Sequence, residues 1–127
     1  MATIVVVEDQ PDNLKLITTL LGLKGHQVIG LASGDGLLDV MRTHQPPPAL
    51  ILLDIQLPGR DGYQLLEDLK KLEGDRSWKV VALTAHAMPA DRERARAAGF
   101  DGYITKPIDV RTLPAEVARF LSSPAPP

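Results

Sequence analysis

The sequence contains no cysteine, and this absence excludes a disulfide framework, a thiol nucleophile and a zinc site built from cysteine ligands. Long apolar runs are also missing, because the longest, residues 4–7 and 49–53, are far too short to span a bilayer. No basic region precedes an apolar stretch at the N-terminus, so we expect no secretory signal. There is no excess of basic residues, with 14 Lys and Arg against 16 Asp and Glu, which argues against direct binding to DNA or to a membrane surface.

What is present is typical of one globular domain. The chain has 127 residues, of which 44% are hydrophobic and 24% charged, and its formal net charge is −2. We therefore expect a soluble, cytoplasmic protein with one domain at residues 1–121. Residues 122–127 are rich in proline and serine, and we expect them to form a flexible tail.

Five short stretches rich in Val, Ile and Leu recur along the chain at fairly even spacing, and we interpret each as a strand. The first, third and fourth are apolar almost throughout, which is typical of strands buried on both faces of a parallel sheet. The predicted strands are residues 4–7, 27–32, 49–53, 79–83 and 102–105.

The segments between these strands have apolar residues at steps of three and four, which predicts helices. The helices are expected to begin near residues 11, 37, 63, 89 and 113, with Gly74 and Gly99 as stop signals for the third and fourth. Strands that alternate with helices indicate a parallel sheet covered on both faces. The predicted fold is a doubly wound α/β domain, and five strands of this size commonly adopt the flavodoxin-like order 2-1-3-4-5.

Polar residues end or follow four of the five predicted strands. Glu8 and Asp9 follow the first strand, Asp54 the third, Thr84 the fourth and Lys106 the fifth. Open α/β sheets bind ligands beyond the carboxyl ends of their strands, so these side chains are expected to meet at one ligand-binding edge. Packing alone would favour apolar residues at these positions.

This set of residue types favours phosphoryl transfer. If the first and third strands are neighbours, Asp9 and Asp54 converge, and their mutual repulsion is relieved by a hard divalent ion such as Mg²⁺. Lys106 can supply a second positive charge through its long side chain. A metal, a lysine and a hydroxyl around one carboxylate suit phosphoryl transfer, with Asp54 as the nucleophile that forms an acyl phosphate.

Over essentially its full length the chain resembles the receiver domain of two-component response regulators. The resemblance rests on four motifs and on their joint spacing, and with T-A-H-A-M at 84–88 it is nearest to the small single-domain regulators of the DivK type. The four motifs are V-V-V-E-D at 5–9, L-L-D-I-Q-L-P-G at 52–59, A-L-T-A at 82–85 and Y-I-T-K-P at 103–107.

The resemblance implies a role for each matching residue around the metal. Asp54 is implied to be the phosphoacceptor, taking its phosphate from a histidine kinase or a histidine phosphotransfer protein. Asp9 is implied to bind Mg²⁺ directly and Glu8 through water. Asp54 and the main-chain carbonyl of Gln56 are the further implied ligands.

The resemblance also implies a switch. Thr84 contacts the phosphoryl group, Lys106 pairs with it, and the Lys106–Pro107 peptide bond is cis, a conformation that costs an X-Pro bond only about 0.5–1 kcal/mol. Tyr103 is the aromatic residue that turns inward when Thr84 moves. A phosphoryl group adds negative charge and acceptor oxygens, so we expect a population shift that downstream partners read on the face formed by residues 89–98 and 102–105.

Each of these residues also has an ordinary structural interpretation. Glu8 and Asp9 could begin the first helix, Thr84 could cap a helix and Lys106 could be a solvated surface lysine. Tyr103 could be a core residue, and the arginines at 92, 94 and 96 are expected to form a solvated face. His26, His44 and His86 have no common ligand spacing, although His86 and Gln56 stand at positions that border the attacking water in the resembled family.

Two other functions stay open. An Mg²⁺-dependent phosphohydrolase with an aspartyl nucleophile needs a second carboxylate two residues after the nucleophile, where this chain has Gln56. A phosphorylation-independent interaction domain would not need the full set of site residues.

We expect a domain that is not an enzyme beyond its own phosphoryl transfer and dephosphorylation. A start at Met1 directly before the first strand favours a stand-alone chain without an output domain, and a receiver cut from a hybrid kinase is the alternative.

Overall fold

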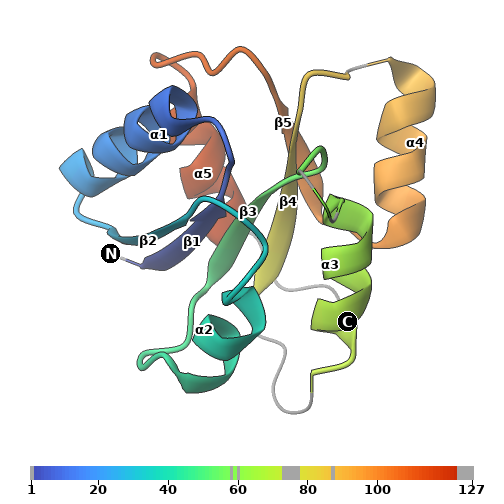
Figure 1. Cartoon of the computed structure of the whole chain (residues 1–127). Coiled ribbons are helices and arrows are strands. Elements are labelled where there is room, and N and C mark those ends of the chain that lie inside the picture. Colours follow the sequence, from blue (N-terminus) through green and yellow to red (C-terminus); the bar gives the residue numbers. More distant parts are fainter. Residues whose placement is uncertain (1, 58, 60, 73–77, 87, 123–127) are drawn as a thin grey trace.

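Strands alternate with helices along the described part of the chain (Figure 1). The computed structural model describes residues 2–57, 59, 61–72, 78–86 and 88–122. The strands of this described part are β1 (Thr3–Val7), β2 (Gln27–Leu31), β3 (Leu50–Asp54), β4 (Lys79–Thr84) and β5 (Gly102–Thr105). The helices are α1 (Pro11–Leu23), α2 (Leu37–Thr43), α3 (Gly62–Lys70), α4 (Pro89–Ala98) and α5 (Leu113–Ser122).

The strands form one parallel sheet in the order β2-β1-β3-β4-β5. The predicted doubly wound, flavodoxin-like α/β fold with strand order 2-1-3-4-5 is confirmed. Every residue of β1, β3 and β4 is buried, and this explains why their sequences are apolar almost throughout. The edge strands β2 and β5 keep partly exposed positions, so their sequences are more mixed.

Helices cover both faces of the sheet, and successive side chains of a strand point to opposite faces. Val5 and Val7 of β1 pack in one core cluster with the buried residues of α2, α3 and α4. Ile4 and Val6 pack in a second cluster with the buried residues of α1 and α5. Each fully buried aliphatic side chain contributes about 1.5–3 kcal/mol relative to its exposed state, so the two clusters provide the main driving force for this fold.

The start of α3 is held close to the end of β3. The Gly62 N–H donates to the Ile55 carbonyl at 2.7 Å, and Asp61 caps the helix together with Gln64 in a capping box. A side chain at position 62 would place its Cβ 2.7 Å from the carbonyl oxygen of Asp54. Glycine is therefore required where α3 meets the last residue of β3.

The carboxyl end of α4 is held more firmly than its amino end. Gly99 ends the helix with φ of 112°, a left-handed conformation that glycine adopts at no steric cost. The Lys70 ammonium of α3 donates to the Ala98 carbonyl, and Phe100 is buried just beyond the helix. At the amino end, Met88 provides no side-chain cap and is 69% exposed.

The observed boundaries differ from the predicted ones by a residue or two. Thr3 is the first residue of β1. Asp54 is the last residue of β3, and Thr84 is the last residue of β4. All three belong to the strands because their main chains stay in register with the neighbouring strands. Ser122, which we had expected in the tail, is the last residue of α5, and its hydroxyl donates to the Arg119 carbonyl. Gly74, predicted to stop α3, and the rest of the predicted tail at 123–127 lie outside the described residues.

Candidate functional site

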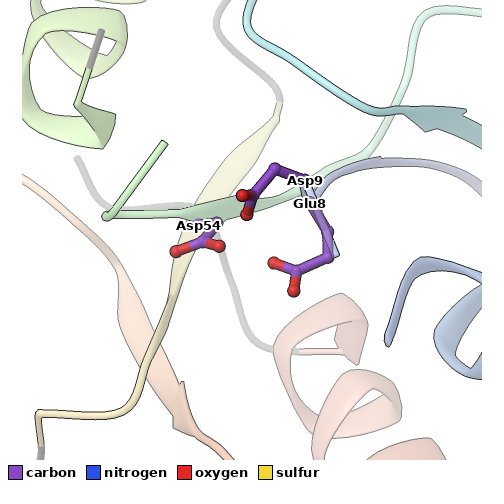
Figure 2. A group of neighbouring side chains, drawn as sticks. All are labelled: Glu8, Asp9 and Asp54. Atoms are coloured by element: carbon purple, nitrogen blue, oxygen red, sulfur yellow. The ribbon is translucent and has the colours of Figure 1, made fainter. Parts of the chain in front are cut away.

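Three carboxylates meet at the carboxyl edge of the sheet. Glu8 and Asp9 directly follow β1, and Asp54 ends the neighbouring strand β3. One carboxylate oxygen from each residue lies within 4.8 Å of the others, and Figure 2 shows the three side chains converging from the two strands. The sequence expectation that these acidic groups share one site agrees with this geometry.

Lys106 reaches the carboxylates from the end of β5, which lies two strands from β3 in the sheet. Its ammonium lies 2.8 and 2.9 Å from the two oxygens of Glu8 and 2.9 Å from Oδ2 of Asp54. The lysine follows β5, so its side chain crosses β4 to reach β3 and β1. Its side chain is 16% exposed, which rules out the solvated surface lysine considered above. The Lys106–Pro107 peptide bond is cis, the conformation that the resemblance implies.

Asp54 is buried and bound on both of its oxygens. Oδ1 accepts the Gln56 N–H at 2.9 Å, and Oδ2 accepts the Lys106 ammonium. Burial raises the pKa of Asp54 above its ordinary value of 3.8, and the neighbouring Glu8 raises it further, whereas Lys106 and the Gln56 N–H act in the opposite direction. Burial alone would lower the pKa of Lys106, but its bonds to Glu8 and Asp54 outweigh burial and raise it. The site therefore favours the charged form of Lys106, while burial and the nearby Glu8 disfavour the charged form of Asp54.

Asn13 is a site residue that our sequence reasoning missed. Its side-chain amide donates to Oε1 of Glu8 at 3.1 Å, while Glu8 itself is fully buried. Asn13 lies in the first turn of α1. Its place five residues after Glu8 was the one available clue, because a loop that turns directly into a helix brings these two positions together.

Thr84 ends β4 beside this cluster and is also buried. Its hydroxyl oxygen accepts the His86 N–H at 2.9 Å and lies 3.4 Å from the His86 carbonyl. The Gln56 side-chain amide lies 2.6 Å from Nε2 of His86, so the loops after β3 and β4 are linked at the mouth of the site. This Gln56–His86 contact was not predicted from the sequence.

Tyr103 lies away from the carboxylates, on β5 beneath α4. Its register partner on β4 is Ala82, two residues before Thr84, so Tyr103 and Thr84 point to the same face of the sheet. Arg92, Arg94 and Arg96 of α4 are all exposed, as predicted for a solvated face, and two of them also lie over tyrosine rings. Arg92 lies over the Tyr103 ring at 4.6 Å and Arg94 over the Tyr63 ring at 4.3 Å, although both arginines are exposed to solvent.

The acidic cluster fits a hard divalent cation. All of its donors are carboxylate oxygens, and among the described cations only Lys106 forms a salt bridge with it. Oxygen ligands and excess negative charge are what Mg²⁺ prefers in proteins. With a carboxylate cluster that could hold a metal ion, a half-buried lysine and a threonine hydroxyl, the edge has the kinds of group that suit the binding of a phosphoryl group.

Known proteins are similar in sequence to this chain over most of its length. Residues 4–118 match the family described as "Response regulator receiver domain". The polar-differentiation response regulator DivK of Brucella ovis is 43% identical over 108 residues, which cover 85% of this chain and 86% of that protein. The sensor histidine kinase GacS of Pseudomonas protegens is 38% identical over 120 residues, which cover 92% of this chain but only 13% of GacS.

A solved structure supports the same grouping. The CheY-like response regulator receiver domain protein of Methanospirillum hungatei superposes with a TM-score of 0.80 at 29% identity, covering 95% of this chain and 94% of that one.

In the part of the chain that the structure describes, none of the helices combines the length and the apolar character needed to cross a membrane.

Proposed function

This chain belongs to the response regulator receiver family, and from that premise we propose that Asp54 accepts a phosphoryl group in a two-component or phosphorelay system. The proposal rests on one observation above all, the buried Asp54 carboxylate held between the Lys106 ammonium and the acidic pair at Glu8 and Asp9. The proposed receiver unit is residues 1–121, which includes the whole of the family match.

In the proposed reaction, a carboxylate oxygen of Asp54 attacks the phosphorus of a phosphohistidine on a sensor kinase or phosphotransfer protein. The new O–P bond forms as the N–P bond breaks, and the leaving imidazole takes up a proton. The Lys106 ammonium, already within 2.9 Å of Asp54, is placed to share its protons with the incoming phosphoryl oxygens. The Gln56 N–H holds the other oxygen of Asp54, so that the carboxylate keeps one orientation.

Glu8, Asp9, Asp54 and the main-chain carbonyl of Gln56 are the groups that would hold Mg²⁺ here. When bound, the ion supplies positive charge that offsets the negative charge of the phosphoryl group and the carboxylates. Asn13 supports this role because its amide fixes the Glu8 carboxylate, which is fully buried. Glu8 itself is bound on both oxygens by Lys106, which suits an indirect role through water better than direct ligation.

Thr84 is proposed to report the phosphoryl group to the surface. Its hydroxyl oxygen now accepts the His86 N–H, and its single proton can turn to a phosphoryl oxygen once one is present. Movement of Thr84 would leave space for Tyr103, which lies on the same face of the sheet. The shift is limited by the difference in contacts that the phosphoryl group makes in the two states.

Downstream partners are proposed to read the face formed by α4 and β5. A groove of about 310 Å³ lies there, and its lining includes Arg92, Arg96, Phe100 and Tyr103. The proposed setting is cytoplasmic, where histidine kinases deliver phosphoryl groups, and the proposed catalysis is limited to the domain's own phosphorylation and dephosphorylation.

The test is incubation with acetyl phosphate and Mg²⁺ followed by intact-mass measurement. We expect one phosphoryl adduct that requires Mg²⁺ and is absent from Asp54→Asn. Asp39→Asn, which changes an exposed aspartate on α2, serves as the matched control and should be modified like the wild type. The absence of any Asp54-dependent adduct would refute the proposal, and repeated turnover of a phosphomonoester would instead favour the phosphohydrolase alternative.

A further inference from the structure

Arg92 and Tyr103 form a contact that the phosphoryl chemistry does not use. The guanidinium carbon of Arg92, in the first half of α4, lies 4.6 Å from the centroid of the Tyr103 ring. Arginine over the face of an aromatic ring is an attractive cation–π geometry, and at exposed sites it changes an equilibrium by about two- to fivefold. Arg92 is exposed and Tyr103 is half-buried, so the contact belongs to this exposed class.

Tyr103 borders two pockets that also share Arg92 and Ala95 in their linings. One is the groove between α4 and β5, and the other is a smaller pocket of about 90 Å³ whose lining also includes Thr84. Because Tyr103 and Thr84 line the same pocket, it offers the ring space in the direction of Thr84. A ring that moves toward Thr84 must change its position under the Arg92 guanidinium.

We propose that Arg92 is a positioning residue that holds Tyr103 in its present orientation and so lowers the population of the inward orientation. This inference rests on the proposed function, in which an inward Tyr103 accompanies phosphorylation of Asp54. A contact that exists in only one of two states favours that state by its own free energy. Removal of the contact therefore increases the affinity for a phosphoryl group or its mimic by up to the same factor, which is reached when the outward orientation predominates in the free chain.

The chain carries a matched control on the same helix. Arg94 lies over the Tyr63 ring at 4.3 Å, so it makes the same kind of contact with a tyrosine of α3. Tyr63 also packs edge-to-face on Phe100, with ring centroids 5.7 Å apart. If the contact of Arg92 acts through Tyr103, loss of Arg94 should leave the coupling between Asp54 and Tyr103 unchanged.

The experiment titrates the full chain with beryllofluoride in the presence of Mg²⁺ and follows the tyrosine rings by NMR with ¹³C-labelled tyrosine. The sequence has only 2 tyrosines, so the signals of Tyr63 and Tyr103 can be assigned by substitution. For Arg92→Gln we expect beryllofluoride to bind about two- to fivefold more tightly. The Tyr103 signals of the free variant should already lie closer to their beryllofluoride-bound positions.

Arg92→Lys keeps a cation over the ring and should restore part of the wild-type behaviour, whereas Arg94→Gln should bind beryllofluoride like the wild type. Urea unfolding of each variant verifies that the fold is intact. If the wild type responds at Tyr103 but Arg92→Gln has the same affinity and the same Tyr103 signals, the positioning role is refuted while the proposed function stands. If beryllofluoride leaves Tyr103 of the wild type unchanged, the proposed switch fails, and the role of Arg92 fails with it.

Discussion

Replacement of Lys106 by methionine tests the charge balance of the site directly. The side chain keeps a similar length, but Glu8 and Asp54 lose the one described cation that forms salt bridges with them. Glu8 is 0% exposed and Asp54 is 2% exposed, so neither carboxylate can recover its lost bonds from water. Removal of one partner from a buried ion pair costs about 3–5 kcal/mol, and the 16% exposure of the Lys106 side chain places our expectation at the lower end, about 3 kcal/mol.

The assay is urea unfolding at neutral pH, followed by circular dichroism, with and without a chelator. With chelator present we expect Lys106→Met to lose about 3 kcal/mol relative to the wild type. Addition of Mg²⁺ should restore more stability to the variant than it adds to the wild type, because the ion then neutralises carboxylates that no lysine neutralises. An ion at one hundred times its dissociation constant stabilises by about 2.7 kcal/mol, which is enough to measure.

Lys15→Met is the matched control, since it makes the same chemical change at an exposed position of α1. Its stability should stay within about 0.5 kcal/mol of the wild type. If Lys106→Met were as stable as the control in the presence of chelator, the carboxylates would not need the lysine. If Mg²⁺ stabilised the wild type and Lys106→Met equally, the acidic cluster would not be where the ion acts. Either result would refute our reasoning about the site.

Three further predictions concern single contacts. Asn13→Ala should destabilise the fold by about 1.5–3 kcal/mol in urea unfolding, because it removes a hydrogen bond to the buried Glu8 carboxylate, and an unchanged midpoint would contradict that role. Gly62→Ala should cost about 1–3 kcal/mol and slow modification of Asp54, since its Cβ would meet the Asp54 carbonyl at 2.7 Å; modification at the wild-type rate would refute the second effect. Burial lowers the pKa of His26 below 6.5 and its Nδ1 accepts the Ala2 N–H, so the folded state binds the proton more weakly than the unfolded state. The stability that neutral His26 contributes is therefore complete above pH 6.5 and is lost as the pH falls through the folded-state pKa. The free energy of unfolding of His26→Gln should not show this loss.

The sequence was sufficient to predict the fold and the position of the acidic site, for a physical reason. Parallel strands bring their carboxyl ends to one edge, so the polar residues that end β1, β3, β4 and β5 are placed by topology alone. Once Asp54 and Lys106 are assigned to strand ends, their proximity depends only on the strand order and on the reach of a lysine side chain. The structure then adds the distances, such as the 2.9 Å between Lys106 and Asp54.

The contacts that the sequence did not predict depend on the rotation of helices and on loop conformation. Arg92 and Arg94 look like solvated residues in a helical pattern, because nothing in the spacing shows which tyrosine lies beneath each of them. The Gln56–His86 contact joins two loops that are 30 residues apart in the chain. Ser122 continues α5 because a helix end depends on hydrogen bonds of its last turn, which proline and serine content alone does not define.

Because its carboxyl end is held more firmly than its amino end, α4 would tilt about Gly99 as its fulcrum. A helix rises about 1.5 Å per residue, so Arg92 lies about 10 Å from that fulcrum. A tilt of about 10° would then displace Arg92 by roughly 2 Å, while Ala98, next to the fulcrum and bound by Lys70, would hardly move. A partner that binds the amino half of α4 would sense such a tilt, and a partner that binds only its carboxyl half would bind both states alike.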